Sequence, residues 1–600
     1  MALPEIEAHS MDVLVIGAGG AGLRAAIEAR QAGLRTGVVC KSLLGKAHTV
    51  MAEGGIAAAL GNVWEADSWR THFRDTMRGG KMLGDWRMAQ LHAQEAPERV
   101  LELEAWGAVF DRTADGRIAQ RDFGGHRFAR LAHVGDRTGL EMVRTLQQRA
   151  VSLEAEVFME CVILRLLVSD GEVTGALGVW RDSGQFVLFR AKALVLATGG
   201  VGKAFRVTSA SWEYTGDGQA LALWAGAELA DMEFVQFHPT AMVWPPSVVG
   251  LLVTEGVRGD GGVLRNSEGR RFMFDYIPAY YAAETADTEE EADRWYADKA
   301  NNRRTPDLLP RDEVARAINT EVKAGRGGPH EGVWLDIATR HDADYIRRRL
   351  PSMYHQFMEL ADVDITSAAM EVGPTCHYMM GGVRVDPETG ATSIPGLFAA
   401  GEVAAGLHGA NRLGGNSLGD LLVFGRRAGL GAVGRGRQGG GLPPLDSLEV
   451  ATACDAAMAL FRREGGESPY AIHADLQQTM QSLVGIVRTE AELSRALTEI
   501  TALEERLARV SVEGGRQFNP GWHLALSLRS LLEVSRCIAT AALARQESRG
   551  GHTRDDFPDP DPAWGAVNQV LRLEGGELVL RRERVPPLPA ELASLFEEDP

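Results

Sequence analysis

A cluster of glycines near the start of the chain constrains its fold more than any other feature. Residues 17–22 read Gly-Ala-Gly-Gly-Ala-Gly, after an apolar run at residues 13–16 and before a helical pattern at residues 23–32. Glycines at this spacing permit a tight turn, and the positive end of the following helix favours a bound pyrophosphate. A second apolar run follows at residues 37–40. The sequence therefore predicts a strand–turn–helix unit that binds a dinucleotide.

Two distant segments extend this unit. Residues 193–200 have the pattern of a buried strand that ends in a glycine turn, and residues 395–402 repeat that pattern. If both segments belong to the same dinucleotide-binding domain, the residues between them must include an insertion, which we expect at residues 235–370. The prediction is an α/β protein whose discontinuous Rossmann-like domain, at residues 11–234 and 371–430, carries an inserted α+β capping domain.

The last third of the chain has a different pattern. Residues 445–545 carry apolar side chains at helical spacing, such as Leu493 and Ile500, and predict a helical domain. A glycine-rich stretch at residues 429–444 predicts a flexible linker before it. Residues 546–600 are rich in proline and glycine and predict an irregular C-terminal tail.

Composition limits what the chain can bind. A chain of 600 residues is too long for one core, and its net charge of −18 argues against a nucleic-acid partner. The five cysteines are widely spaced with no CxxC pair, so we expect a reducing compartment and neither an iron–sulfur cluster nor another metal site within this chain. No apolar run reaches the ~18–20 residues that span a bilayer, and the first residues lack the pattern of a signal peptide. Any membrane association is expected to come through a partner.

The region after the second apolar run departs from a standard NAD site. Such sites place an acidic residue about 20 positions beyond the glycines, where this chain has Cys40 and Lys41. This departure weakens the interpretation as an NAD-binding protein. His48 follows, just beyond the strand end that faces a dinucleotide. An imidazole there is either an ordinary packed side chain or a nucleophile that carries a flavin.

Cationic and hydrogen-bonding side chains recur in glycine-dense, otherwise apolar segments further along the chain. They are His238, Thr254, Glu255, Arg258, Arg311, His377 and Arg412. Each has an ordinary alternative, because a lone histidine near a strand end or a lone arginine before a helix is usually structural. Together they can form two clusters of donors that clamp a small dianion by its two carboxylates.

Over nearly its whole length the chain resembles the flavoprotein subunit of succinate dehydrogenase and fumarate reductase, and its residues 41–51 look most like the actinobacterial type. The matching motifs are residues 17–22, Lys41, and residues 48–50, 53–55, 215–218, 238–240, 254–256, 377–382, 411–417 and 547–552. So many motifs in the same order are far more specific than a glycine loop alone.

The resemblance implies a role for each matching residue. FAD would be bonded covalently to His48 and held by Gly17, Gly19, Gly20, Gly22, Lys41, Thr49, Gly54, Gly55, Asp217, Glu402, Ser417 and Leu418. The substrate carboxylates would bind His238 with Thr254, and His377 with Arg412. Arg311 would exchange the substrate proton, which would be relayed through Glu255 and Arg258.

The reaction that the resemblance implies is oxidation of succinate to fumarate by hydride transfer to FAD, with fumarate reduction as its reverse. Electrons would pass to an iron–sulfur subunit, and then through membrane anchor subunits to quinone. The chain would lie on the cytoplasmic face of the cell membrane, held there by its partner subunits.

Four positions stand out against the family's usual pattern. Lys46 and Ala47 replace an Arg-Ser pair before the flavin histidine, Val257 replaces a frequent cysteine, and Glu53 stands where the family has Gln or Glu. None of these departures removes a catalytic group. The alternative enzyme is L-aspartate oxidase, a relative that lacks the flavin-linking histidine, so His48 argues against it. The other alternative is a non-catalytic electron-transfer or assembly protein, which retention of the clamp residues disfavours.

Overall fold

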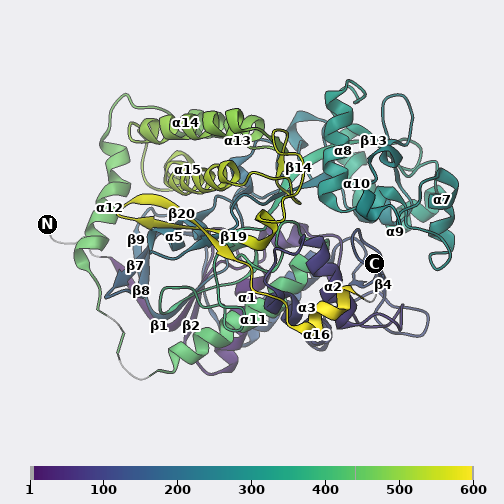
Figure 1. Cartoon of the computed structure of the whole chain (residues 1–600). Helices are drawn as coiled ribbons and strands as arrows, with labels where there is room; N and C mark the ends of the chain where they lie inside the picture. The colour runs from purple at the N-terminus through teal and green to yellow at the C-terminus, as the bar shows by residue number, and fades with distance from the viewer. Residues whose placement is uncertain (1–5, 439–440, 443, 598–600) are drawn as a thin grey trace.

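The computed structural model describes residues 6–438, 441–442 and 444–597 and has a mixed α/β architecture (Figure 1). The main sheet has the strand order β6-β2-β1-β9-β8-β7, with β16 paired to β9. Its strands are β1 (Glu7–Ile16), β2 (Thr36–Val39), β6 (Glu156–Phe158), β7 (Cys161–Ser169), β8 (Glu172–Trp180), β9 (Phe186–Leu196) and β16 (Leu397–Ala399).

The predicted strand–turn–helix unit is confirmed as β1, α1 (Gly20–Gln31) and β2. The strand β1 lies between two parallel neighbours, β2 and β9. A strand buried on both faces shows a continuous apolar run rather than an alternating one. That explains the apolar run of β1, in which Val13, Leu14 and Val15 are fully buried.

The two distant segments meet in the main sheet as the sequence predicts. Leu397 pairs with Leu194 and Ala399 pairs with Leu196, so β16 runs parallel to β9. Between them in the chain lies a second, antiparallel sheet of order β11-β14-β13-β12, seen with α8 (Arg311–Lys323) on the right of Figure 1. Its strands are β11 (Val235–Met242), β12 (Val263–Arg265), β13 (Val333–Asp336) and β14 (Met370–Met379). This sheet has its own hydrophobic core, which includes Val257.

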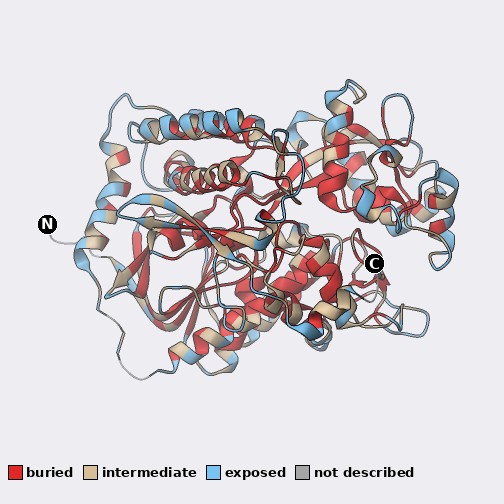
Figure 2. Cartoon of the chain, in the orientation of Figure 1, coloured by how far each residue is buried: buried red, intermediate tan, exposed pale blue. Residues whose placement is uncertain are grey.

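The predicted helical region is present as four helices. They are α12 (Ser447–Arg462), α13 (Pro469–Leu483), α14 (Glu490–Leu507) and α15 (Pro520–Ala544). In α14 the apolar stripe faces inward, with Leu493 and Ile500 fully buried, and the opposite face is exposed (Figure 2). No helix in the described ranges is both long and apolar enough to cross a bilayer.

Two predictions about irregular segments are wrong. The expected linker is helical in its first half, because α11 (Asn416–Gly436) runs into it; residues 439, 440 and 443 lie outside the described residues. The expected irregular tail contains a hairpin of β19 (Val567–Glu574) and β20 (Glu577–Arg584), and then α16 (Ala590–Ala593). Gly575 and Gly576 both adopt positive φ, at 60° and 92°, which is the geometry of a two-residue hairpin turn.

Candidate active site

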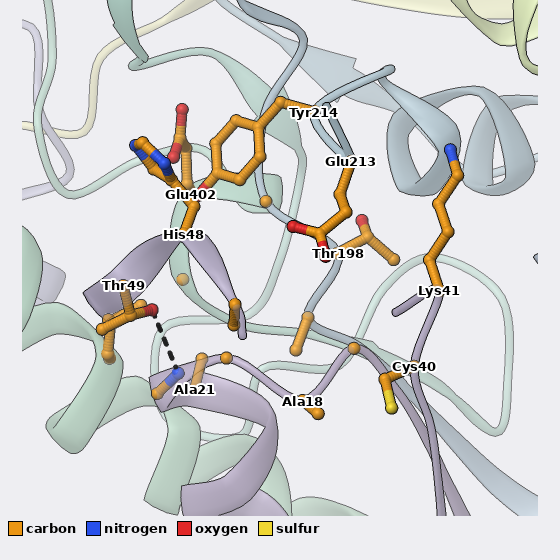
Figure 3. Close-up of a pocket in the computed structure, with 18 of the residues that line it drawn as sticks. Ala18, Ala21, Cys40, Lys41, His48, Thr49, Thr198, Glu213, Tyr214 and Glu402 are labelled. Carbon is orange, nitrogen blue, oxygen red and sulfur yellow. Dashed lines mark hydrogen bonds between the residues drawn. The ribbon is translucent and has the colours of Figure 1, made fainter. Parts of the chain in front are cut away.

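A cavity opens where β1, β2 and β9 end, and Figure 3 shows some of the side chains that line it. Its lining includes Gly17, Gly19, Gly20, Lys41, His48, Thr49, Asp217, His377, Glu402, Arg412, Ser417 and Leu418, all of which the sequence predicts as site residues. The carboxyl ends of parallel strands are where α/β folds bind dinucleotides. Gly22, Gly54 and Gly55 belong to the same predicted group but do not line this cavity.

The glycine loop leaves no room for side chains. Gly17 has φ +116°, and a Cβ there would lie 2.1 Å from the carbonyl oxygen of Ala197. A Cβ on Gly22 would lie 1.8 Å from the carbonyl oxygen of Gly17. Gly22 therefore contributes by letting α1 approach β1 closely. Gly54 also has a packing role, since a Cβ there would meet the Phe123 ring at 2.5 Å.

Two helix N-termini contribute to the same cavity. The helix α1 begins after Gly19 and α11 after Gly415; neither has a capping side chain at that position or an acidic residue in its first turn. The Thr49 hydroxyl accepts a hydrogen bond from Gly20 N at 3.3 Å, drawn as the dashed line in Figure 3. Uncapped helix N-termini favour anionic ligands. The cavity thus fits an extended, negatively charged dinucleotide such as FAD.

Polar side chains stand at the end of β2. Lys41 Nζ donates to Thr215 Oγ1 at 2.7 Å and lies 2.9 Å from Asp217 Oδ2. Glu213 also lines the cavity and hydrogen-bonds Ser42, close to where an acidic residue would follow β2 in a standard fingerprint. Sequence reasoning missed Glu213, because no local motif marks a residue that reaches the site from a remote loop.

His48 begins a short 3₁₀ helix, His48–Met51, on the cavity wall. Its Nδ1 accepts a hydrogen bond from Ser211 N at 3.3 Å, and its ring meets the Tyr214 ring edge-on at 4.6 Å. Burial, with a smaller contribution from Lys203, lowers the pKa of His48 to about 4. The imidazole is therefore neutral at physiological pH, and any reaction with a ligand would use Nε2.

Two histidines lie close together on the neighbouring strands β11 and β14; of the two, His377 lines the cavity and His238 does not. The pairing of these strands shifts register between Gln236 and Phe237, opposite His377, and such bulges re-aim side chains. The rings of His238 and His377 lie 5.2 Å apart. Burial and nearby arginines hold the pKa of each well below its ordinary value, so both are neutral. A neutral imidazole has one N–H, so each ring donates to an anion from Nε2 only in the tautomer that carries the proton there; His238 Nδ1 lies 2.9 Å from the carbonyl oxygen of Thr240, and His377 Nδ1 lies 2.8 Å from Ser209 Oγ.

Arg412 lies between the cavity and a second, buried group of charged side chains. Its guanidinium stacks 4.1 Å from the centre of the Tyr378 ring and donates to Ser417 Oγ at 2.7 Å. Burial, and then the neighbouring Arg311, lower the pKa of Arg412 to about 10. The side chain stays charged at neutral pH, and its Nε has no hydrogen-bond partner within the described structure. It is suited to receive a carboxylate.

Arg311, Glu255 and Arg258 form the charge cluster next to Arg412. Arg311 Nε donates to Glu255 Oε2 at 2.9 Å, and Arg258 approaches the same oxygen at 3.8 Å. Gly124 N donates to the other carboxylate oxygen at 2.6 Å. Burial alone would raise the pKa of Glu255, but the two arginines outweigh it and lower that pKa to about 2. The family resemblance implies that these three residues form one relay, and in the structure both arginines lie within 4 Å of the Glu255 carboxylate.

Thr254 and the position of Arg311 on its helix are the remaining features of the predicted substrate site. Thr254 is buried, and its hydroxyl accepts from Gly256 N at 3.3 Å, which leaves its own proton for a ligand. Arg311 is the first residue of α8. A cation at a helix N-terminus is disfavoured by the helix dipole, and the charge of Arg412 opposes it as well. Glu255 is therefore the main group that offsets the charge of Arg311 at this place.

Comparison with known proteins places the chain among flavoproteins. Residues 12–418 match the family model "FAD binding domain", and residues 473–585 match "Fumarate reductase flavoprotein C-term". A fumarate reductase (CoM/CoB) polypeptide from Methanothermobacter marburgensis is 43% identical, over 93% of this chain and 97% of the relative. The succinate dehydrogenase flavoprotein subunit of Coxiella burnetii is 38% identical, over 98% of each.

A solved structure resembles the whole fold. Sdh1 of Mycobacterium smegmatis, solved in complex with UQ1, is 59% identical to this chain with a TM-score of 0.86. The likeness covers 99% of this chain and 97% of that one.

Proposed function

The chain belongs to the family of succinate dehydrogenase and fumarate reductase flavoprotein subunits, and we propose that its own reaction is the oxidation of succinate to fumarate. It is an FAD-dependent oxidoreductase. When bound, FAD supplies the acceptor for a hydride and its two electrons. The observation that carries the proposal is the buried pair Arg311–Glu255 beside Arg412, which itself lines the dinucleotide cavity.

The chain's own residues would bind the substrate carboxylates and transfer the substrate proton. His238 with Thr254, and His377 with Arg412, would bind the two carboxylates. Arg311 would remove the proton from the substrate carbon and pass it through Glu255 and Arg258. An arginine is normally a poor base, so proton transfer by Arg311 would require tight geometry between its guanidinium group and the substrate carbon.

FAD would be held by the residues predicted for it, with Glu213 added. Gly17, Gly19, Gly20, Lys41, Asp217, Glu402, Ser417 and Leu418 line the cavity, and Gly22, Gly54 and Gly55 shape the backbone around it. We place the covalent bond at His48, supported by its position on the wall and its neutral imidazole. Precipitating the protein in acid tests this: flavin fluorescence should stay with the polypeptide, and a colourless pellet would contradict the bond.

The partners that we propose are an iron–sulfur subunit, together with membrane anchor subunits that lead to quinone. All five cysteines of the chain are free and buried, which leaves no exposed thiolate to hold a cluster. The chain would lie on the cytoplasmic face of the membrane through these subunits. We also propose the domain limits expected from the sequence: 11–234 with 371–430, 235–370, 445–545 and 546–600.

An activity assay on the complex purified from membranes tests the function. Succinate should reduce an artificial electron acceptor, and fumarate should oxidise a reduced dye; the ratio of the two rates gives the preferred direction. Turnover of L-aspartate without turnover of succinate or fumarate would instead support the aspartate oxidase alternative.

A further inference from the structure

Gln236 lies between the two arginines of the site. It is buried on β11, two residues before His238 and on the same face of that strand. Its side-chain oxygen accepts from Arg412 at 3.0 Å and from Arg311 at 3.3 Å. One amide oxygen thus receives hydrogen bonds from two like-charged guanidinium groups.

The amide of Gln236 has a single workable orientation. Its nitrogen donates to Asn411 Oδ1 at 2.8 Å and to the carbonyl oxygen of Arg412 at 2.7 Å. Both lone pairs of the oxygen and both protons of the nitrogen are therefore used. In the flipped orientation the amide nitrogen would face the N–H groups of both arginines, and the amide oxygen would face two other oxygens. None of these pairs can form a hydrogen bond, which is costly in a buried site.

A second bond joins the same two segments. Asn411 Nδ2 donates to Asp312 Oδ1 at 2.9 Å, and these residues are the sequence neighbours of Arg412 and Arg311. Lys81 approaches the other oxygen of Asp312 at 3.7 Å. The segments that carry Arg311 and Arg412 are therefore linked twice, once through Gln236 and once through the Asn411–Asp312 hydrogen bond.

We propose that Gln236 is a positioning residue that sets the spacing between Arg311 and Arg412. The inference deepens the proposed function and rests on its assignment of proton transfer to Arg311 and carboxylate binding to Arg412. Two buried guanidinium groups repel each other, so a shared neutral acceptor is needed to hold them at a fixed separation without cancelling their charge. A carboxylate in its place would satisfy both arginines and leave neither for the substrate.

Two variants of the holoenzyme complex separate these effects. Gln236→Met keeps the length of the side chain and removes its strong hydrogen bonds. We expect kcat for succinate to fall about 100-fold, because small displacements of a reacting group cost that much, while KM changes less than about tenfold. Gln236→Glu keeps the shape and adds a charge. We expect it to weaken fumarate binding at least about 100-fold between pH 7 and 8, measured by the absorbance change of the flavin.

Gln569→Met is the matched control. Gln569 is also a buried glutamine, but it lies on β19 and donates to the carbonyl oxygen of Ala541, away from the arginines. The Gln569→Met variant should be less stable than the wild type but should keep its turnover. If Gln569→Met and Gln236→Met lose turnover equally, the loss is a general effect of removing a buried amide.

Arg311→Gln in the same assay separates this inference from the proposed function. If Arg311→Gln is inactive and Gln236→Met turns over within about threefold of the wild type, the role of Gln236 is overturned and the proposed function stands. If Arg311→Gln keeps its turnover, the proposed function itself fails. Loss of FAD from both Gln236 variants would also overturn a role confined to arginine spacing.

Discussion

The loop at residues 17–22 and the cluster around Arg311 both face negative charge in the proposed function, but they supply positive charge differently. The loop uses backbone N–H groups at a helix end and depends on the absence of side chains. The cluster uses guanidinium groups that are almost fully buried and depends on close pairing with Glu255. The loop should therefore be sensitive to added volume, and the cluster should be sensitive to loss of charge and to loss of the planar guanidinium geometry.

Arg412→Lys should have the largest effect on the cluster. Lysine keeps the charge but loses the planar fork that contacts Ser417, Gln236 and the Tyr378 ring. We expect kcat/KM for succinate to fall by about 10³-fold or more, comparable with loss of a key site donor. The exposed Arg384 offers a control, because Arg384→Lys should leave kcat/KM unchanged. An active Arg412→Lys enzyme would show that charge alone suffices in the cluster.

Gly17→Ala should break the loop by volume alone. The added Cβ would meet the carbonyl oxygen of Ala197 in a left-handed backbone conformation, and we expect a loss of ~3 kcal/mol in stability together with release of FAD. Gly33→Ala is the matched control, since Gly33 also has positive φ, +79°, but no atom within 4 Å of a Cβ. It should cost only ~1 kcal/mol. Thermal unfolding and flavin content measure both; equal losses would contradict the steric explanation.

Glu255→Gln should impair turnover more than binding. The change leaves the shape intact but removes the counter-charge of Arg311 and Arg258, so a proton can no longer pass between them through a carboxylate. We expect kcat to fall about 100-fold with the affinity for fumarate retained, in line with the usual size of general acid–base contributions. Stopped-flow flavin reduction and a fumarate titration make the comparison. A variant that loses affinity but not rate would place Glu255 in binding.

Acid should act on stability through buried histidines before it acts on Glu255. Burial lowers the pKa of His92 and His126 to about 3, so the folded state resists protons that the unfolded chain accepts below its ordinary pKa of 6.5. Each of these two histidines should lower the free energy of unfolding by about 1.4 kcal/mol per pH unit as the pH falls below 6.5. Glu255, with its pKa lowered to about 2, loses its contribution only below 4.5. A melting temperature that stays constant from about pH 7 to 5 would contradict this order.

The two regions also differ in how far the sequence predicts them. The loop is a local pattern, so β1, Gly17, Gly22 and α1 follow from a short stretch and elementary sterics. Membership of the cluster and its relay through Glu255 and Arg258 were predicted through the family resemblance, but the hydrogen bonds that link Arg311 to Arg412 were not. The hydrogen bonds of Gln236 and the Asn411–Asp312 bond depend on how β11, α8 and the segment before α11 pack together. No spacing rule expresses that arrangement.

The wrong predictions have a physical reason of the same kind. Glycine and proline disfavour helices and strands locally, so a composition rich in them indicates a loop only where no tertiary contact stabilises a regular element. The hairpin β19–β20 is completed by pairing with β10 (Leu229–Ala230), and the end of α11 packs against the main sheet. Both contacts join residues far apart in the chain.

The reduction of bound flavin by succinate, followed in a single turnover, tests the central claim most directly. In the wild-type complex succinate should bleach the flavin absorbance, and in Arg311→Gln it should not, although fumarate should still perturb the flavin spectrum and so report an intact binding site. Bleaching of Arg311→Gln at the wild-type rate would contradict the assignment of proton transfer to Arg311.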